Sequence, residues 1–339
     1  MIKGCNITDE WTYRGMRTLI LENSLLKATI LLDFGAKLHE FVYKPSNRDF
    51  MYHNPRVECR QPVFGANVDN WWTGGMDEAI PTGHPCEYKG EEYPFLGEVW
   101  SLPWDYQIIS RSKEEIQVHL WRTTVISPLL VEKWITLRQD ESVLHFHHKI
   151  TNLSDSNIEF LWGIHPGFSI NSSCRIDLPA KDMLIDESLP DDRLGKRWTR
   201  YEWPKAKDEN GQEVDMRFIP PPESLTCEFH YATQLLEGWL AITDADAKEG
   251  VAMVFDKGIF RSAWLWLVYG GWRGLYTAAV EAWTGYPAKL SEAVEWGKYS
   301  LLKQREVLEC DTMLMAYSGI GSVKSITETG EVLEANPTT

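Results

Sequence analysis

The sequence is poor in positive charge. Its 339 residues include 34 lysines and arginines against 49 aspartates and glutamates, which gives a formal net charge of −15 at pH 7. Nucleic acids and anionic membrane surfaces bind clustered basic residues, so we expect neither as a partner. No run approaches the ~20 apolar residues that span a bilayer. The first residues also lack the apolar core of a secretory signal.

Closely spaced cysteine pairs are missing as well. The six cysteines are scattered, and no two stand in a C-x-x-C pattern. In a chain of this size, that spacing favours free thiols in a reducing compartment over a disulfide framework. Together with the missing export signal, it predicts a cytoplasmic protein.

Sustained helical periodicity is also absent. Short runs of β-branched and aromatic residues, separated by turn residues, predict antiparallel strands. The clearest runs lie at 17–22, 26–32, 37–43, 115–122, 129–137, 142–150, 157–163, 239–243, 250–255, 262–269 and 312–317. Short helices are expected near 190–198 and 290–296. The sequence therefore predicts an all-β fold.

Two long segments, 54–103 and 179–223, are predicted to be irregular, and loops of that length usually form functional walls or lids. We find no internal repeat, low-complexity tract or linker-like change of composition. The sequence therefore predicts a single domain over 1–326, followed by a frayed tail over 327–339.

Tryptophan is abundant, with 16 residues, and segment 54–103 interleaves aromatic rings with carboxylates. A sugar site needs rings that stack on C–H faces and carboxylates that accept hydroxyl hydrogen bonds. We therefore expect Asp77, His84, Glu98 and Trp100 to face a sugar cleft. An aromatic loop packed on the edge of the fold explains the same residues equally well.

Three histidines stand close together in the run 142–150. Strand alternation places His145 and His147 on one face and His148 on the other. With no third ligand in view, a solvated sheet face is favoured over a metal site, and no metal is expected.

Two polar residues stand near the ends of apolar runs. His165 lies in Trp-Gly-Ile-His-Pro-Gly-Phe (162–168), where proline and glycine are expected to end the strand. Its imidazole either faces a pocket or is buried as a structural residue. Glu281 either pairs with an arginine, such as Arg261 or Arg273, or serves as a base. Spacing alone decides neither case.

Taken in order, several segments resemble the galactose mutarotase-like (aldose 1-epimerase) superfamily: 21–30, 130–137, 161–168, 280–287 and 295–301. The resemblance covers most of the chain. It implies a large antiparallel β-sandwich, a supersandwich, whose concave face binds a sugar.

By this resemblance, His165 matches the family's general acid and Glu281 its general base. The base would take the anomeric proton while the acid protonates the ring oxygen. The ring opens, rotates about C1–C2 and closes as the other anomer. These roles require an ionised Glu281 and a protonated His165. They imply a cofactor-free mutarotase acting on a monosaccharide, with Trp266 and Trp283 completing the expected substrate-binding set.

One position departs from the family pattern. Where the family commonly has a second histidine before a glycine, this chain has Leu96. His84, from the same loop, is a candidate substitute. The departure favours an unusual monosaccharide. It also leaves open a non-catalytic carbohydrate-binding or regulatory protein on the same fold, or an accessory domain of a lyase or glycosidase. The oligomeric state is not predicted.

Overall fold

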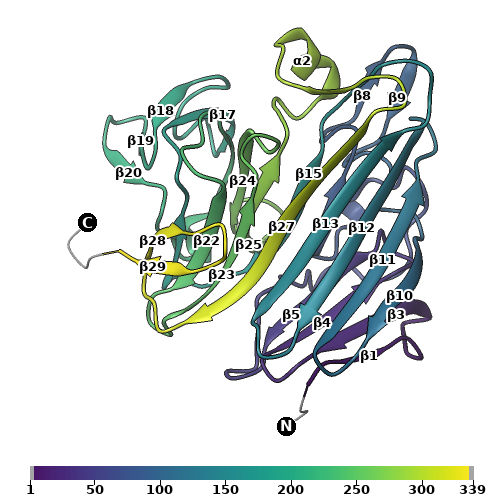
Figure 1. The fold of residues 1–339 in the computed structure, drawn as a ribbon. Helices are drawn as coiled ribbons and strands as arrows, with labels where there is room; N and C mark the ends of the chain where they lie inside the picture. Colours follow the sequence, from purple (N-terminus) through teal and green to yellow (C-terminus); the bar gives the residue numbers. More distant parts are fainter. Residues whose placement is uncertain (1–3, 336–339) are drawn as a thin grey trace. The chain divides into compact units, whose positions relative to one another are not determined.

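The computed structural model describes residues 4–335, and most of their regular structure is antiparallel β-strand (Figure 1). Two short helices, α1 (Val68–Trp71) and α2 (Leu290–Glu295), and a 3₁₀ turn, η1 (Pro222–Ser224), accompany the strands. The expected all-β fold is confirmed. The expected helix near 290–296 is also present.

The chain divides into two compact units, which are described separately. Unit 1 comprises Met1–Pro166 and Thr284–Thr312, and unit 2 comprises Gly167–Trp283 and Met313–Thr339. Two strands, β15 (Gly163–Ser169) and β27 (Val307–Ser318), begin in unit 1 and end in unit 2. A single domain over 1–326 stays a prediction.

Unit 1 contains strands of two sheets. The first has the order β1 (Asn6–Thr8), β3 (Met16–Glu22), β4 (Leu26–Leu31), β5 (Lys37–Tyr43), β7 (Gly75–Ala79) and β15, with β2 (Thr12–Tyr13) beside β3 and β6 (Arg48–Asp49) beside β5. The second has the order β10 (Asp105–Arg111), β11 (Glu115–Thr123), β12 (Leu129–Arg138), β13 (Val143–Asn152) and β27 (Figure 1). Unit 1 also contains two separate two-stranded sheets. One pairs β8 (Cys86–Tyr88) with β9 (Glu91–Tyr93), and the other pairs β14 (Ile158–Phe160) with β26 (Ser300–Leu302).

Strand alternation builds the core of unit 1. Along β13, Leu144, Phe146, His148 and Ile150 are buried, while His145 and His147 are half-buried. The predicted separation of the three histidines onto two faces is therefore confirmed.

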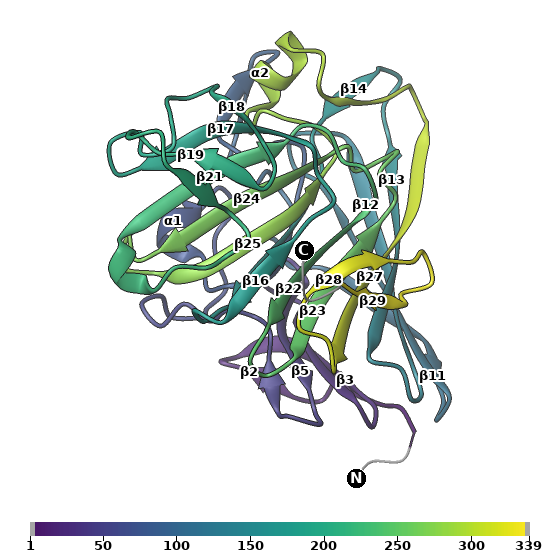
Figure 2. The same cartoon turned by 90° about the vertical axis from the view of Figure 1, so that its left-hand side faces the viewer.

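Unit 2 contains a large antiparallel sheet and a smaller group of strands. The sheet has the order β25 (Tyr276–Trp283), β24 (Ser262–Tyr269), β21 (Thr226–Ala232), β17 (Asp182–Leu189), β18 (Arg200–Glu202), β19 (Lys205–Lys207) and β20 (Glu213–Asp215) (Figure 2). The smaller group has the order β23 (Glu249–Phe255), β22 (Trp239–Asp244) and β16 (Cys174–Asp177), and β28 (Val323–Ile326) pairs with β29 (Val332–Glu334).

Several local expectations are wrong. Segment 179–223 holds the four strands β17–β20, and 54–103 holds α1 and β7–β9. No helix forms at 190–198, where Asp191, Asp192 and Trp198 have positive φ angles. Strand β15 continues through His165 and Pro166. Proline loses only its N–H donor there, and its carbonyl remains available for pairing.

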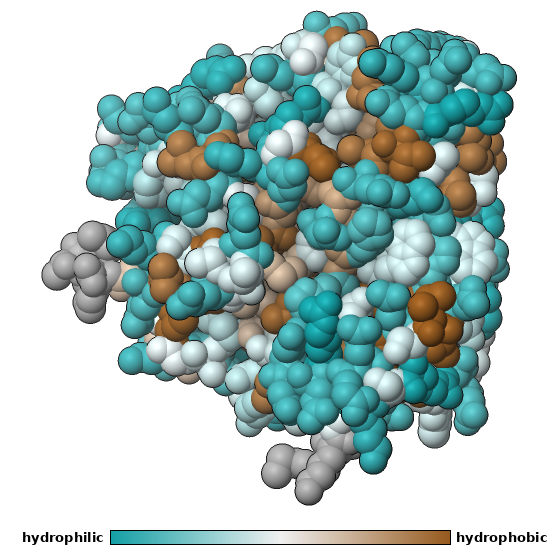
Figure 3. Space-filling model, viewed as in Figure 1, coloured by the Kyte–Doolittle hydropathy of each residue, from teal (hydrophilic) through white to brown (hydrophobic). Residues whose placement is uncertain are grey.

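Two further observations concern the tail and the surface. Within the tail expected to be frayed, 332–334 form β29, while 336–339 lie outside the described residues. Hydrophilic residues cover most of the face in Figure 3, with apolar ones in small groups. Among residues 4–335, no helix is long and apolar enough to cross a membrane. The six cysteines are free thiols.

Candidate functional site

His165 lies in strand β15 of unit 1 and is 8% exposed. Its ring meets Trp72 edge-on, with ring centroids 6.0 Å apart. Burial lowers the pKa of His165 from its ordinary value to about 4, and the positive charges of Lys37 and His84 act in the same direction. The resting imidazole is therefore neutral at pH 7, unlike the protonated form that the general-acid role requires.

Asp77, also in unit 1, forms a buried ion pair with Lys37. Lys37 of β5 lies 3.2 Å from the Asp77 carboxylate of β7, and both side chains are fully buried. The Lys37 ammonium also donates to the Gly74 carbonyl at 2.8 Å and to the Thr73 hydroxyl at 3.2 Å. Burial raises the pKa of Asp77, and Lys37 opposes that rise.

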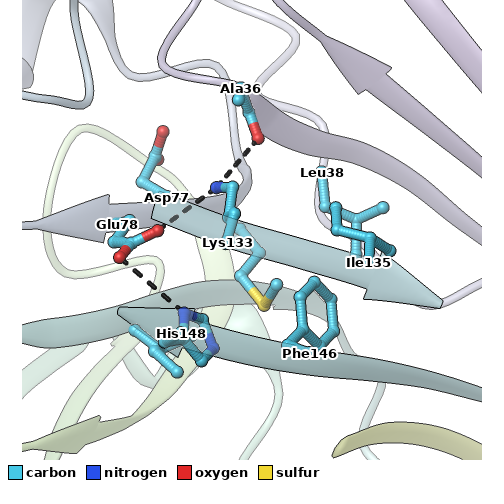
Figure 4. Close-up of a pocket in the computed structure, with 10 residues that line it drawn as sticks. Ala36, Leu38, Asp77, Glu78, Lys133, Ile135, Phe146 and His148 are labelled. Carbon is cyan, nitrogen blue, oxygen red and sulfur yellow. Dashed lines mark hydrogen bonds and ion pairs between the residues drawn. The ribbon is translucent and has the colours of Figure 1, made fainter. Parts of the chain in front are cut away.

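A second polar network surrounds Glu78, the neighbour of Asp77 on β7 (Figure 4). Its carboxylate lies 3.2 Å from the Lys133 ammonium and accepts the Trp162 indole N–H at 3.0 Å. The His148 Nδ1 lies 3.9 Å from Glu78 Oε1. Asp77, Glu78, Lys133 and His148 line a cavity of about 20 Å³ together with several apolar residues. That volume holds about one water molecule, so the cavity is not a sugar site.

Two residues expected at a sugar cleft have structural roles. The carboxylate of Glu98 is fully buried and accepts the backbone N–H groups of Val125, Ile126 and Ser127 at 2.6, 2.5 and 3.0 Å. Trp100 is also fully buried, and its indole donates to the Phe95 carbonyl at 2.9 Å. We therefore remove Glu98 and Trp100 from the candidate site.

The backbone segments that carry His84 and Leu96 are hydrogen-bonded to each other. Leu96 is buried at a positive φ of 56°, and its N–H donates to the Gly83 carbonyl at 2.7 Å. The ring of His84 meets Phe95 edge-on, with centroids 4.8 Å apart. His84 thus lies beside Leu96, and it acts electrostatically on His165.

In unit 2, Glu281 lies on strand β25 and is 1% exposed. The indole N–H of Trp283 donates to Glu281 Oε2 at 2.6 Å. Trp264, the register partner of Glu281 on β24, stacks on Trp283 with centroids 3.6 Å apart and planes 7° apart. Burial raises the pKa of Glu281 well above its ordinary value, and the Trp283 hydrogen bond opposes that rise.

The same sheet face carries more aromatic and polar groups. Trp266 follows Trp264 by two residues on β24, is half-buried and meets Trp272 edge-on at 5.6 Å. The ring of Tyr231 contacts that of Trp264, and the Tyr231 hydroxyl donates a hydrogen bond to the Asp186 carboxylate. The face around Glu281 is thus lined by aromatic rings, of which Trp264, Trp283 and Tyr231 are buried and Trp266 is half-buried.

Sequence reasoning missed several residues of these clusters. Lys133 carried a readable signal, because it interrupts the apolar face Leu129, Val131, Ile135 and Leu137 of one strand. Trp264 had a similar signal, since the register of β24 and β25 follows from their adjacent apolar runs. Trp72 had none, because its contact with His165 joins residues far apart in the chain.

Comparison with solved structures identifies the fold. A protein of Klebsiella pneumoniae, provisionally named an aldose 1-epimerase, matches with a TM-score of 0.71, at 15% identity over 91% of this chain and 82% of its own. This chain has the galactose mutarotase-like fold. The expected supersandwich class is thereby confirmed.

Two further solved structures agree. A galactose mutarotase-like protein of Clostridium acetobutylicum matches with a TM-score of 0.63, at 12% identity over 94% of this chain and 100% of its own. A galactose mutarotase related enzyme of Lactobacillus acidophilus matches with a TM-score of 0.60, at 16% identity over 89% of this chain and 97% of its own. A scan of known protein families finds no match. Within residues 4–335, no three His, Cys, Asp or Glu side chains could together hold a metal ion.

Proposed function

We propose that this protein is a cofactor-free mutarotase that interconverts the α and β anomers of a monosaccharide, with His165 as general acid and Glu281 as general base. The observation that carries the proposal is the environment of Glu281. The Glu281 carboxylate lies beside the stacked indoles of Trp264 and Trp283 on a sheet face, where burial raises its pKa. Perturbed carboxyls of this kind are typical of acid–base sites.

Burial opposes both charges that the proposed roles require. It lowers the pKa of His165 to about 4 and raises the pKa of Glu281. Ring opening needs a proton delivered to the ring oxygen and a base for the anomeric hydroxyl. The proposed roles require that proton to lie on His165 when the sugar is bound.

The remaining candidates fit this proposal as groups around the sugar. We propose that Asp77, His84 and Trp266 contact it. Trp266 offers a half-buried indole for stacking on a ring face. Asp77 is held by Lys37 and offers carboxylate oxygens to hydroxyl groups. We also propose a cytoplasmic location, because the six cysteines are free thiols, as is usual in a reducing compartment.

The experiment is polarimetry on freshly dissolved single anomers of a panel of monosaccharides. The proposal predicts that at least one anomer reaches equilibrium faster with protein than with buffer alone. It also predicts a bell-shaped pH dependence of kcat/KM, because one group must donate a proton and the other must accept one. Binding of sugars without any acceleration would favour the non-catalytic carbohydrate-binding protein, for which the neutral His165 and the buried Leu96 both argue.

A further inference from the structure

The environment of Glu281 contains one directed polar contact that the proposed acid–base chemistry does not yet use. The Trp283 indole N–H donates to Oε2 of Glu281 at 2.6 Å, a short distance even for a hydrogen bond to a carboxylate. Trp283 is fully buried, and the parallel ring of Trp264 covers it at 3.6 Å. The donor is therefore held in one orientation by packing.

An indole N–H has a chemical property that a hydroxyl or imidazole lacks. It can donate a hydrogen bond but cannot accept one. Facing a carboxyl group, it therefore stabilises the ionised form and gives nothing to a protonated oxygen at the same place. Burial acts in the opposite direction and raises the pKa of Glu281. The Trp283 hydrogen bond thus opposes the effect of burial on the pKa of Glu281.

We propose that Trp283 is the positioning residue of the general base: it holds Oε2 of Glu281 and fixes the orientation of the carboxylate that removes the anomeric proton. This inference rests on the proposed mutarotase function and deepens it. Trp283 was expected to contact the sugar. It acts instead through Glu281, and Trp264 acts in turn by fixing the plane of the Trp283 ring.

The charged groups near this face do not replace the indole. On β21, Glu228 and His230 alternate with Phe229 and Tyr231, and the latter two share the face of Trp264 and Trp266, so Glu228 and His230 point to the opposite face. The Asp186 carboxylate accepts hydrogen bonds from the Tyr231 hydroxyl and the Arg197 guanidinium.

Two arginines flank the β24–β25 pair. Arg261 precedes β24, and Arg273 lies in the turn after it, over the ring of Trp272. Burial and the Trp283 hydrogen bond act on the pKa of Glu281 in opposite directions. Removing the indole N–H therefore removes a group that favours the ionised base.

The test is the variant Trp283→Phe, which keeps an aromatic ring for stacking and removes the N–H donor. A hydrogen bond to a charged group is worth enough to shift a pKa by about 1–2 units. The limb of the kcat/KM profile that reports Glu281 should move up by that amount. Activity should fall about tenfold or more below the limb and recover at higher pH, with little change in KM. An unmoved limb would overturn the proposal.

Trp239→Phe is the matched control. Trp239 is also a buried tryptophan of unit 2 whose indole donates to a carboxylate, that of Glu237 at 2.7 Å, away from Glu281. It should leave the limb where the parent protein has it. A purely structural role for Trp283 predicts that both variants lower stability and that neither moves the limb.

Direct titration separates this inference from the function on which it rests. The Glu281 carboxyl can be followed by ¹³C NMR of glutamate-labelled protein and assigned with Glu281→Gln. An upward shift of its midpoint in Trp283→Phe supports the positioning role even if no sugar is interconverted, and an unchanged midpoint overturns it. If Trp283→Phe does not fold, Trp264→Leu, which leaves the indole but removes its stacking partner, should give a smaller shift in the same direction. An unchanged midpoint in Trp264→Leu would then overturn the proposal.

Discussion

Acid should destabilise this protein through buried histidines, and His148 provides the clearest case. His148 is 3% exposed, and burial lowers its pKa from 6.5 to about 4. Above pH 6.5 neither the folded nor the unfolded chain protonates this ring. As the pH falls from 6.5 to 4, His148 binds a proton in the unfolded chain but not in the folded chain, so the free energy of unfolding decreases. Below pH 4 both states are protonated, and the slope ends.

The magnitude follows from the size of the pKa shift. One pKa unit corresponds to about 1.4 kcal/mol, so His148 alone removes about 3 kcal/mol of the free energy of unfolding between pH 6.5 and 4. His39 and His165 are also buried, and burial lowers the pKa of each to about 4. The free energy of unfolding of the parent protein should therefore fall with pH across this range, with a slope that corresponds to more than one proton taken up on unfolding.

Urea unfolding followed by tryptophan fluorescence at a series of pH values measures that slope. His148→Leu should reduce it by about one proton relative to the parent. His147→Asn, on the solvent-facing side of the same strand, controls for loss of a histidine from β13 and retains the contribution of His148. The same slope in His148→Leu and in the parent between pH 6.5 and 5 would refute the argument.

Two other substitutions test the buried polar groups of unit 1. Glu98→Ala should lower the free energy of unfolding by about 3 kcal/mol, because three buried N–H groups lose their acceptor, while sugar binding stays unchanged in a titration; weakened binding without lost stability would restore Glu98 to the site. Lys133→Met should cost about 3–5 kcal/mol by leaving Glu78 unpaired, and the double variant Lys133→Met/Glu78→Met should recover most of that loss in urea unfolding. Two additive losses would contradict the pairing.

Strands with continuous apolar or alternating patterns could be predicted from the sequence. The run 262–269 coincides with β24, and 37–43 coincides with β5, because burial on a sheet face dictates both patterns. The three-residue strands β18–β20 could not be predicted. Their residues have weak patterns, and pairing with neighbouring strands holds them in place.

The candidate site shows the same division. His165 and Glu281 stand in motifs that a sequence can carry, but their protonation states depend on burial that no motif records. Glu98 looked like a sugar ligand by its residue type and loop. Its partners are backbone N–H groups at 125–127, and this tertiary contact decides its role.

Exchange NMR on the two anomers of a sugar that the protein interconverts tests the central claim most directly. The parent protein, Glu281→Gln and His165→Asn are compared for the rate of interconversion and for sugar affinity. The account predicts that each variant loses about 10²–10⁴-fold in rate, because general acid or base catalysis is removed. Sugar affinity should stay within about tenfold, or 1.4 kcal/mol. Near-parental rates in both variants would contradict the assignment of His165 and Glu281 as the acid–base pair.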